Sequence, residues 1–311
     1  MSLRPVKSVV EATPTMEGAG VKLHRGFGFG DTGEFDPFLL FDDFRNDNPA
    51  DFLAGFPWHP HRGIETITYV LAGTVDHGDS LGNRGSLGAG DVQWMTAGSG
   101  ILHQEMPKGD PNGRMHGFQL WANLPKSLKM TNPRYQDVLG KDIPEVTDDD
   151  GTRARIIVGD FWGKRGPVEG IAADPRYLDI SVPPNKTKRI PVEASRHAFA
   201  YVFAGSGTFR DSSKPLPVQT ELVADSTLDR SASRNDPSLT ASMLGNRSLV
   251  LFDSGDEITV TAGDEGIRFL LVSGRPLEEP VAWYGPIVMN TRAELQQAYS
   301  ELQNGTFIKH K

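Results

Sequence analysis

The sequence contains no cysteine. Disulfide bonds and thiolate-bound zinc are therefore excluded, and the absence fits a reducing compartment. The chain also lacks an uninterrupted apolar run of about 18 residues, the length that a membrane-spanning helix needs. Its first residues, MSLRPVKSVVEATPTMEG, have no apolar core of signal-peptide length. We therefore expect a soluble, cytoplasmic protein with no membrane partner.

Positive charge is also in short supply. The chain has 32 Lys and Arg against 40 Asp and Glu, a formal net charge of -8, and no basic run long enough to follow a phosphate backbone. Direct binding to nucleic acid is not expected. An acidic chain suits a basic protein surface better than DNA.

What the sequence does contain is typical of a β-rich protein with two domains. Its 311 residues exceed the usual size of one domain, and 34 Gly and 22 Pro indicate many tight turns. Short strand-like runs separated by turn residues, such as FLLFDDF, IETITYVLAG, GDVQWMTAG and MHGFQLWANL, fill residues 21–124. This spacing predicts a sandwich or small barrel.

A polar stretch at residues 126–153 interrupts the strand pattern. We expect an N-terminal domain at 1–135, a linker at 136–152 and a second domain at 153–311. Within the second domain, residues 211–247 are rich in Ser, Asp, Thr and Pro and predict an exposed insertion. Near the end, Asn290 or Thr291 can cap a helix and Glu294 can close a capping box, which predicts a helix over 291–304.

The two halves share an internal repeat. ITYVLAGTV at 67–75 and FAYVFAGSG at 199–207 have the common core Tyr-Val-x-Ala-Gly. When the copies are aligned on this core, the positions of His59 and His61 are occupied by Pro191 and Glu193 in the second copy. Whatever the two histidines do, the second copy does not repeat it.

His59 and His61 stand one residue apart at the start of an apolar strand, although the chain has only 8 histidines. Alternate residues of a strand share a face, so both imidazoles can reach one ion. This pattern alone is weak, because it also fits two satisfied or solvent-facing histidines. Further on, GSGILHQEMP presents His103 and Glu105 with the same spacing, and two antiparallel strands could aim all four groups inward.

Three imidazoles and one carboxylate without sulfur suit Fe(II), while Mn, Co, Ni and Cu also fit. An octahedral ion with these four ligands keeps two positions for substrate, water or dioxygen. That geometry suits oxygen chemistry.

Four long segments, HPHRGIETITYVLAGTVDHGDSLGNRG, GDVQWMTAGSGILHQEMP, DPFLLFDDF and GRPLEEPVAWYGPIVMNT, closely resemble the pirin family of the cupin superfamily. The resemblance covers both halves. It implies an all-β bicupin, in which two β-barrel domains of the double-stranded β-helix type pack face to face. It also implies one metal per chain, Fe(II), in the N-terminal barrel alone, with ligands that match His59, His61, His103 and Glu105. The segment at 211–247 departs from the family because it is longer than the usual linker.

Glu65 has a competing interpretation. A general cupin motif places a glutamate ligand three or four residues after the histidine pair, and the alternation from His61 also points Glu65 inward. The resemblance to pirins favours Glu105 instead. We expect Glu65 to accept a hydrogen bond from a liganding imidazole or a backbone group.

Other conspicuous residues are expected to be structural. Arg62 lies on the face opposite the ligands and should pair with an acid or a backbone carbonyl. Trp94 and Met95 could line a cavity but are expected in the core, and His77 and His116 are expected to be satisfied or exposed.

Two functions compete. The resemblance implies an iron-dependent dioxygenase of the quercetin 2,3-dioxygenase type, which cleaves a flavonol with dioxygen and releases carbon monoxide, with Glu105 as general base. The alternative is a regulatory protein whose metal oxidation state controls binding to a transcription factor or to a metabolic enzyme such as pyruvate dehydrogenase. Both need the same four ligands. The chain is expected to be a monomer that binds a small aromatic, flavonol-like substrate and dioxygen, with a protein partner in the regulatory case.

Overall fold

The structure is a computed structural model that describes residues 2–210 and 243–310. Most of the expected insertion at 211–247 lies outside the described residues. The described chain is mostly β-strand, as expected from the turn-rich sequence. Within the described ranges, no helix is both long enough and apolar enough to cross a membrane.

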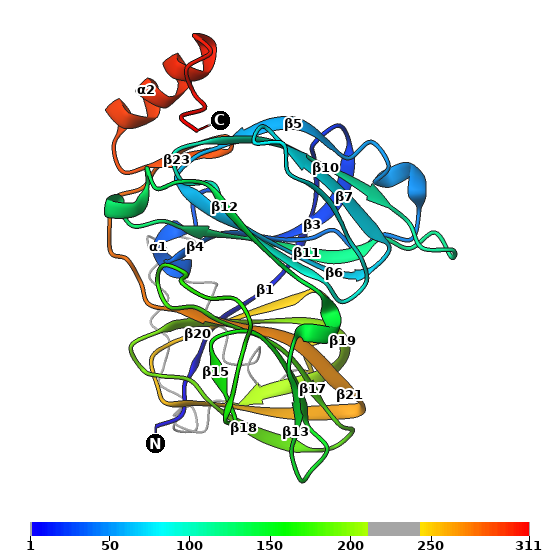
Figure 1. Ribbon diagram of the computed structural model, residues 1–311. Helices are drawn as coiled ribbons and strands as arrows, with labels where there is room; N and C mark the ends of the chain where they lie inside the picture. The colour runs from blue at the N-terminus through cyan, green and yellow to red at the C-terminus, as the bar shows by residue number, and fades with distance from the viewer. Residues whose placement is uncertain (1, 211–242, 311) are drawn as a thin grey trace, which may run out of the picture. The chain divides into compact units, whose positions relative to one another are not determined.

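The strands and helices follow one another in the order shown in Figure 1. The strands of the first half are β1 (Val6–Glu11), β2 (Thr13–Glu17), β3 (Val21–Phe27), β4 (Phe38–Asp43), β5 (Phe56–His61), β6 (Ile64–Ala72), β7 (Thr74–Asp79), β8 (Arg84–Leu87), β9 (Val92–Thr96), β10 (Ile101–Lys108), β11 (His116–Asn123) and β12 (Arg134–Val138). Those of the second half are β13 (Glu145–Thr147), β14 (Arg153–Val158), β15 (Asp160–Phe161), β16 (Lys164–Arg165), β17 (Arg176–Val182), β18 (Thr187–Pro191), β19 (His197–Arg210), β20 (Ser248–Phe252), β21 (Glu257–Gly274), β22 (Ala282–Tyr284) and β23 (Ile287–Met289). The helices are α1 (Thr32–Phe35) and α2 (Arg292–Gln303), with 3-10 turns η1 (Pro49–Asp51), η2 (Lys126–Leu128) and η3 (Gly140–Asp142).

The chain divides into two compact units, and neither is continuous in sequence. The larger unit contains residues 12–144, 156–175 and 274–311, and the smaller unit contains residues 1–11, 145–155 and 176–273. This division differs from the expected domains at 1–135 and 153–311. The reason is pairing between distant segments: β1 at the start of the chain pairs with β20 of the smaller unit, while α2 at the end packs on β23 of the larger one.

Two large sheets form most of the larger unit, which also contains the two-stranded sheets β15-β16 and β22-β23. A seven-stranded sheet has the order β12-β9-β6-β11-β4-β3-β2, and a four-stranded sheet has the order β5-β10-β7-β8. In Figure 1, β5, β10 and β7 form one layer and β6, β11 and β4 form the layer facing it. Between the layers lies an apolar cluster that includes the fully buried Ile64, Met95 and Ile101.

The smaller unit is built on one eight-stranded sheet. Its strand order is β1-β20-β19-β21-β17-β14-β13, with β18 paired to β21. The repeated segment at 199–207 lies in β19, a central strand of this sheet, as the segment starting at Ile67 lies in β6, a central strand of the larger unit. The repeat seen in the sequence therefore occupies comparable positions in both units.

The predicted C-terminal helix is confirmed. In α2, the side chain of Thr291 accepts a hydrogen bond from the backbone of Glu294, and the Glu294 carboxylate accepts one from the backbone of Thr291. This reciprocal pair is a capping box, and it satisfies two amide groups that the first turn would otherwise leave without partners.

Candidate metal centre

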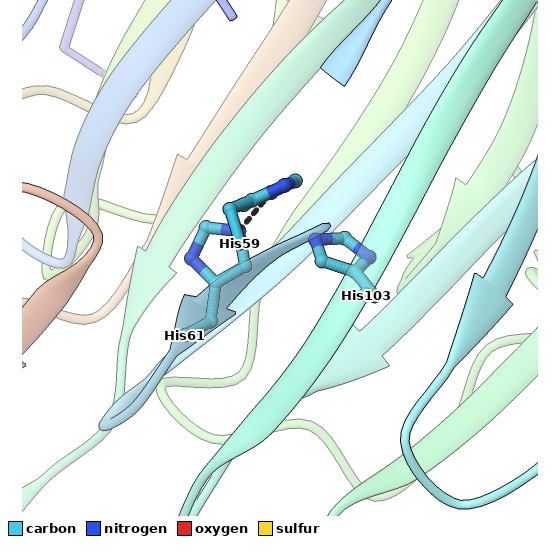
Figure 2. Close-up of side chains that lie close together, drawn as sticks. All are labelled: His59, His61 and His103. Carbon is cyan, nitrogen blue, oxygen red and sulfur yellow. Dashed lines mark hydrogen bonds between the residues drawn. The ribbon is translucent and has the colours of Figure 1, made fainter. Parts of the chain in front are cut away.

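Two neighbouring strands bring three histidines together in the larger unit. β5 pairs with β10 in antiparallel fashion, so that His103 lies opposite His59 and Ile101 lies opposite His61. The nitrogen atoms that these three imidazoles offer all lie within 4.8 Å of one another. Figure 2 shows the three rings gathered between the strands, with His59 and His61 in contact. We call these three residues the histidine cluster.

Backbone carbonyls orient two of the three rings. Nδ1 of His59 lies 2.8 Å from the carbonyl oxygen of Pro57, and Nδ1 of His61 lies 3.2 Å from that of Pro286. A carbonyl can only accept, so each Nδ1 carries the proton and each Nε2 offers a lone pair. This arrangement is the one that metal-binding histidines adopt.

The two Nε2 atoms lie 3.1 Å apart. Two lone pairs at this distance repel each other unless a proton or a metal ion lies between them. Neighbouring ligands of an octahedral ion with bonds of about 2.1 Å would lie about 3.0 Å apart. The spacing of His59 and His61 therefore fits a shared metal ion.

His103 gives a second, independent sign of fit. Its side chain is 1% exposed, and neither ring nitrogen has a hydrogen-bond partner among the described residues. A buried polar nitrogen without a partner is costly, because it has lost its hydrogen bonds to water. A bound metal ion would remove that cost at one of the two nitrogens.

Burial keeps the cluster neutral. It lowers the pKa of His59, and it lowers the pKa of His61 and His103 well below the ordinary value, with nearby histidines adding to the effect at the last two. Neutral imidazole is the form that binds metals. The three imidazoles can therefore bind an ion without first releasing protons.

Glu105 lies on β10 two residues after His103 and lines the same cavity as His59 and His61. Its Oε1 accepts a hydrogen bond of 3.1 Å from the hydroxyl of Thr68. Burial raises the pKa of Glu105 to about 7, although the bond from Thr68 acts in the opposite direction. The carboxylate is not among the groups that converge within 4.8 Å, so its role as fourth ligand stays a prediction.

The cavity beside the cluster has a volume of about 790 Å³ and mostly apolar walls. Its polar groups are few: Thr68, Glu105 and Gln119 lie on strands of the barrel, and Arg25 pairs with Asp42 and Glu17. Aromatic side chains make up much of the remaining wall, namely Phe29, Phe44, Phe52, Phe56, Trp58, Trp121, Trp283 and Tyr284. An apolar cleft with a few polar groups is typical of a small-molecule site.

Glu65 does not face this cavity. Thr68 lies on the cavity wall, and Glu65, three residues earlier on the regular strand β6, points to the opposite face of the sheet. There it accepts a hydrogen bond of 2.7 Å from the hydroxyl of Thr96. The expectation that Glu65 points inward is wrong, because the chain turns between β5 and β6 at Gly63, where φ is +77°, and the alternation starts afresh. Its hydrogen-bond donor is a threonine rather than an imidazole.

The remaining expectations hold. Arg62 is buried and donates to the carboxylate of Glu301 and to two backbone carbonyls. Trp94 and Met95 are 1% and 0% exposed and are not part of the cavity wall.

The other two histidines near the motifs are satisfied, as expected. His77 is hydrogen-bonded to Gln93 at 3.1 Å, and His116 lies 2.6 Å from the carboxylate of Asp47.

Several residues around the cluster had no role in the sequence analysis. Thr68, Gln119 and the β22–β23 turn containing Pro286 are the most important of them. Ile64, Thr66 and Thr68 lie on the same face of β6, because alternate residues of a strand share a face. This pattern was a usable signal that Thr68 could line the cavity wall. Nothing local to Pro286 indicated that its carbonyl would meet His61, which lies 225 residues earlier in the chain.

In the smaller unit, the positions that match the histidine pair have other partners. Pro191 ends β18, and its carbonyl accepts a hydrogen bond from Arg176. Glu193 forms ion pairs with Arg176 and Arg196. Its carboxylate is therefore engaged by two guanidinium groups.

Comparisons with known proteins place the chain in a family. Residues 20–122 match the family model of Pirin, and residues 177–308 match the model of the Pirin C-terminal cupin domain. The chain is 42% identical to a pirin-like protein of Caulobacter vibrioides over 99% of this chain and 100% of that protein. It is 38% identical to a pirin-like protein of Solanum lycopersicum over 97% of this chain and 92% of that protein.

Among solved structures, that of a quercetin 2,3-dioxygenase from Acinetobacter baumannii is similar, with a TM-score of 0.82 and 28% identity over 98% of this chain and 99% of that one. Fold and matches together define a mostly β protein with two cupin-type domains and a short C-terminal helix. The chain belongs to the pirin family.

Proposed function

We propose that the chain is a metal-dependent dioxygenase of the quercetin 2,3-dioxygenase type, with one Fe(II) per chain. The observation that carries this proposal is the histidine cluster itself: the paired rings of His59 and His61 aim unprotonated Nε2 atoms at each other from the wall of an aromatic cavity. The likeness to a quercetin 2,3-dioxygenase supports the substrate class.

His59, His61 and His103 would hold the metal, with Glu105 as fourth ligand. The donor set has three nitrogens, one oxygen and no sulfur, which suits Fe(II) and also accommodates Mn, Co, Ni or Cu. When bound, the ion supplies Lewis-acid and redox chemistry for the reaction with dioxygen.

The chain's own groups bind the substrate and accept its proton. The apolar walls of the cavity bury the planar rings of a flavonol and exclude water from them. Glu105 takes the proton of the 3-hydroxyl group on Oε2, because Oε1 is engaged by Thr68. Burial raises the pKa of Glu105, whereas the charge of a bound ion would lower it, so the carboxylate would be ionised near neutral pH and able to accept a proton.

The overall reaction consumes one flavonol and one dioxygen and releases one carbon monoxide and one ring-opened ester. Both atoms of dioxygen remain in the ester, and the carbon and oxygen of the carbon monoxide come from the flavonol. No external reductant is needed.

The test is to load the protein with Fe(II) without oxygen, then add quercetin and dioxygen. We expect oxygen uptake, carbon monoxide release and loss of the visible absorbance of the flavonol in equal amounts. Glu105→Gln keeps a donor oxygen but loses the basic charge, so turnover should fall much more than metal content.

Glu17→Gln is the matched control, because it removes a carboxylate from the same cavity wall at a position paired with Arg25. It should keep most of the turnover. A fully metal-loaded protein that turns over no flavonol with Fe, Mn, Co, Ni or Cu would refute the proposed activity. Capture of a protein partner that depends on the metal's oxidation state would then favour a regulatory function.

A further inference from the structure

The orientation of His61 depends on a distant part of the chain. Its Nδ1 lies against the carbonyl of Pro286, whereas Nδ1 of His59 lies against a carbonyl of its own strand. The hydrogen bond on one ring nitrogen fixes the tautomer and aims the other nitrogen at the metal. The C-terminal part of the chain therefore decides which nitrogen His61 offers to the cluster.

Helix α2 holds the turn that contains Pro286. The hydroxyl of Tyr299, on α2, donates a hydrogen bond of 2.7 Å to the carbonyl of Tyr284. The indole nitrogen of Trp283 donates one of 2.7 Å to the carbonyl of Gly285. Gly285 has a φ of +53°, and a Cβ at this position would lie 3.0 Å from the hydroxyl of Tyr299. The turn is therefore fixed from the helix and cannot easily accept another residue.

The same segment also holds the end of β5, the strand of the paired histidines. Arg62 follows this strand directly, is 2% exposed, and donates hydrogen bonds to Glu301 at 2.7 Å and to the carbonyl of Phe307 at 2.8 Å. Its guanidinium also lies 4.1 Å from the centre of the Phe307 ring. A third bond, of 2.7 Å, goes to the carbonyl of Ser99, in the turn that leads into β10. One side chain thus ties both ligand-bearing strands to the C-terminal segment.

We propose that three residues near the end of the chain, Tyr299, Glu301 and Phe307, which we call the C-terminal clamp, set the metal affinity of the histidine cluster. The clamp acts by fixing the tautomer of His61 and the end of β5. This inference rests on the proposed metal site and assigns it a control that lies outside the ligand set. Tyr299 and Glu301 contact the segments that hold His61 and do not themselves converge on the cluster, so they are positioning residues.

The first test is Tyr299→Phe, which removes the hydroxyl and keeps the ring that packs against Tyr284. The probe is Co(II), whose affinity is measured by competition with a coloured chelator. Loss of a hydrogen-bonded partner behind a metal ligand typically weakens metal affinity 10- to 100-fold. Tyr299 acts on His61 only through the turn, so Tyr299→Phe should weaken the affinity about 10-fold.

Glu301→Gln is the second variant. It weakens the pair with Arg62 and should lower the Co(II) affinity by a similar factor.

Thr291→Ala is the matched control. It removes the N-cap of α2 and so destabilises the same helix without touching the turn or Arg62. We expect its thermal unfolding temperature to fall at least as far as that of Tyr299→Phe, with Co(II) affinity within twofold of the wild type. Circular dichroism of each variant checks that the fold is kept.

Nitrogen-15 NMR of the metal-free protein provides a readout that needs no metal. The wild type should show His61 protonated on Nδ1, and Tyr299→Phe should show a mixture of tautomers. A wild type that binds no Co(II) would contradict the proposed metal site. The clamp could still be tested in that case, because the tautomer of His61 is measured without metal. Unchanged tautomer and Co(II) affinity within twofold of the wild type, in both Tyr299→Phe and Glu301→Gln, would overturn the clamp.

Discussion

The hydroxyl of Thr68 lies 3.1 Å from Oε1 of Glu105 and 2.8 Å from Oε1 of Gln119. A hydroxyl has one proton and can donate it to only one of these two oxygens. Rotation of the Gln119 amide brings its NH2 group to Thr68, and the hydroxyl then donates to the ionised carboxylate. The chain from Gln119 through Thr68 holds Glu105 by one oxygen and leaves the other for the reaction.

Thr68→Val should therefore lower the kcat for flavonol cleavage by about 10- to 100-fold. The variant keeps the shape of the side chain but loses a hydrogen bond to a charged group, worth about 1.5–3 kcal/mol. KM should change little, because the apolar walls that bury the flavonol do not depend on the hydroxyl. Metal affinity should also fall, because Thr68 holds a proposed ligand, so kcat is compared at saturating Fe(II). Steady-state kinetics together with metal analysis measures both effects. Thr68→Ser should restore most of the rate, and a Thr68→Val enzyme with wild-type kcat would contradict the role given to this bond.

Three aromatic side chains on the cavity wall are unusually exposed. Phe29 is 76% exposed, Trp58 55% and Tyr284 68%, and all three line the cavity beside the histidine cluster. Aromatic contacts contribute about 0.5–1.5 kcal/mol beyond burial of area. Trp58→Ala should raise the KM for a flavonol by about 3- to 10-fold with kcat within twofold. Leu139→Ala, at an exposed leucine outside the cavity wall, is the control and should leave KM unchanged.

The buried carboxyl group of Glu65 should make the free energy of unfolding depend on pH, separately from catalysis. Burial raises its pKa from 4.5 to about 7, in spite of the hydrogen bond from Thr96. The folded protein therefore holds this proton more tightly than the unfolded chain, and stability from this group falls as the pH rises from about 4.5 to 7. A shift of this size corresponds to a loss on the order of 3 kcal/mol.

Glu65→Gln removes the titrating proton and keeps the shape of the side chain. Urea unfolding at pH 5 and pH 8 should show a smaller drop in the free energy of unfolding for Glu65→Gln than for the wild type. Asp110→Asn is the control, at a half-buried carboxylate whose pKa is lowered to about 2 by the hydrogen bond from Arg114. This carboxylate is ionised in the folded and the unfolded chain at both pH values, so its replacement should leave the drop unchanged. Equal drops for Glu65→Gln and the wild type would mean that Glu65 titrates normally.

Much of the site could be predicted from strand alternation. The equal spacing of His59 with His61 and of His103 with Glu105 places each pair on one face, and the antiparallel pairing of β5 with β10 then brings the histidines together. The capping residues of α2 were equally local, since Thr291 and Glu294 lie three residues apart. Signals within one strand or one helical turn are what a sequence pattern carries best.

The rest depended on how the chain changes direction. The alternation from His61 to Glu65 fails because Gly63 ends one sheet and the next strand begins a new one. The contact of His61 with Pro286 spans 225 residues, and the packing of α2 beside Arg62 joins the last part of the chain to the first barrel. Such contacts arise from tertiary folding, so composition and periodicity do not contain them. This is also why the helix was expected in the second domain.

The matched positions in the smaller unit predict a single metal site per chain. Pro191 has no side-chain donor, and Glu193 is engaged by Arg176 and Arg196. Crystals of the metal-loaded protein, measured at the absorption edge of the metal, should show one strong anomalous peak beside the histidine cluster. A second peak of similar height in the smaller unit would mean that the repeat was aligned wrongly.

The central claim is that His59, His61 and His103 hold a metal ion, and elemental analysis of the purified protein tests it most directly. The wild type should contain about one equivalent of a transition metal per chain, and we expect this metal to be iron. The double variant His59→Ala, His61→Ala should lose most of it, while His116→Ala, whose imidazole pairs with Asp47 at the surface, should retain it. A full equivalent of metal in the double variant would contradict the account.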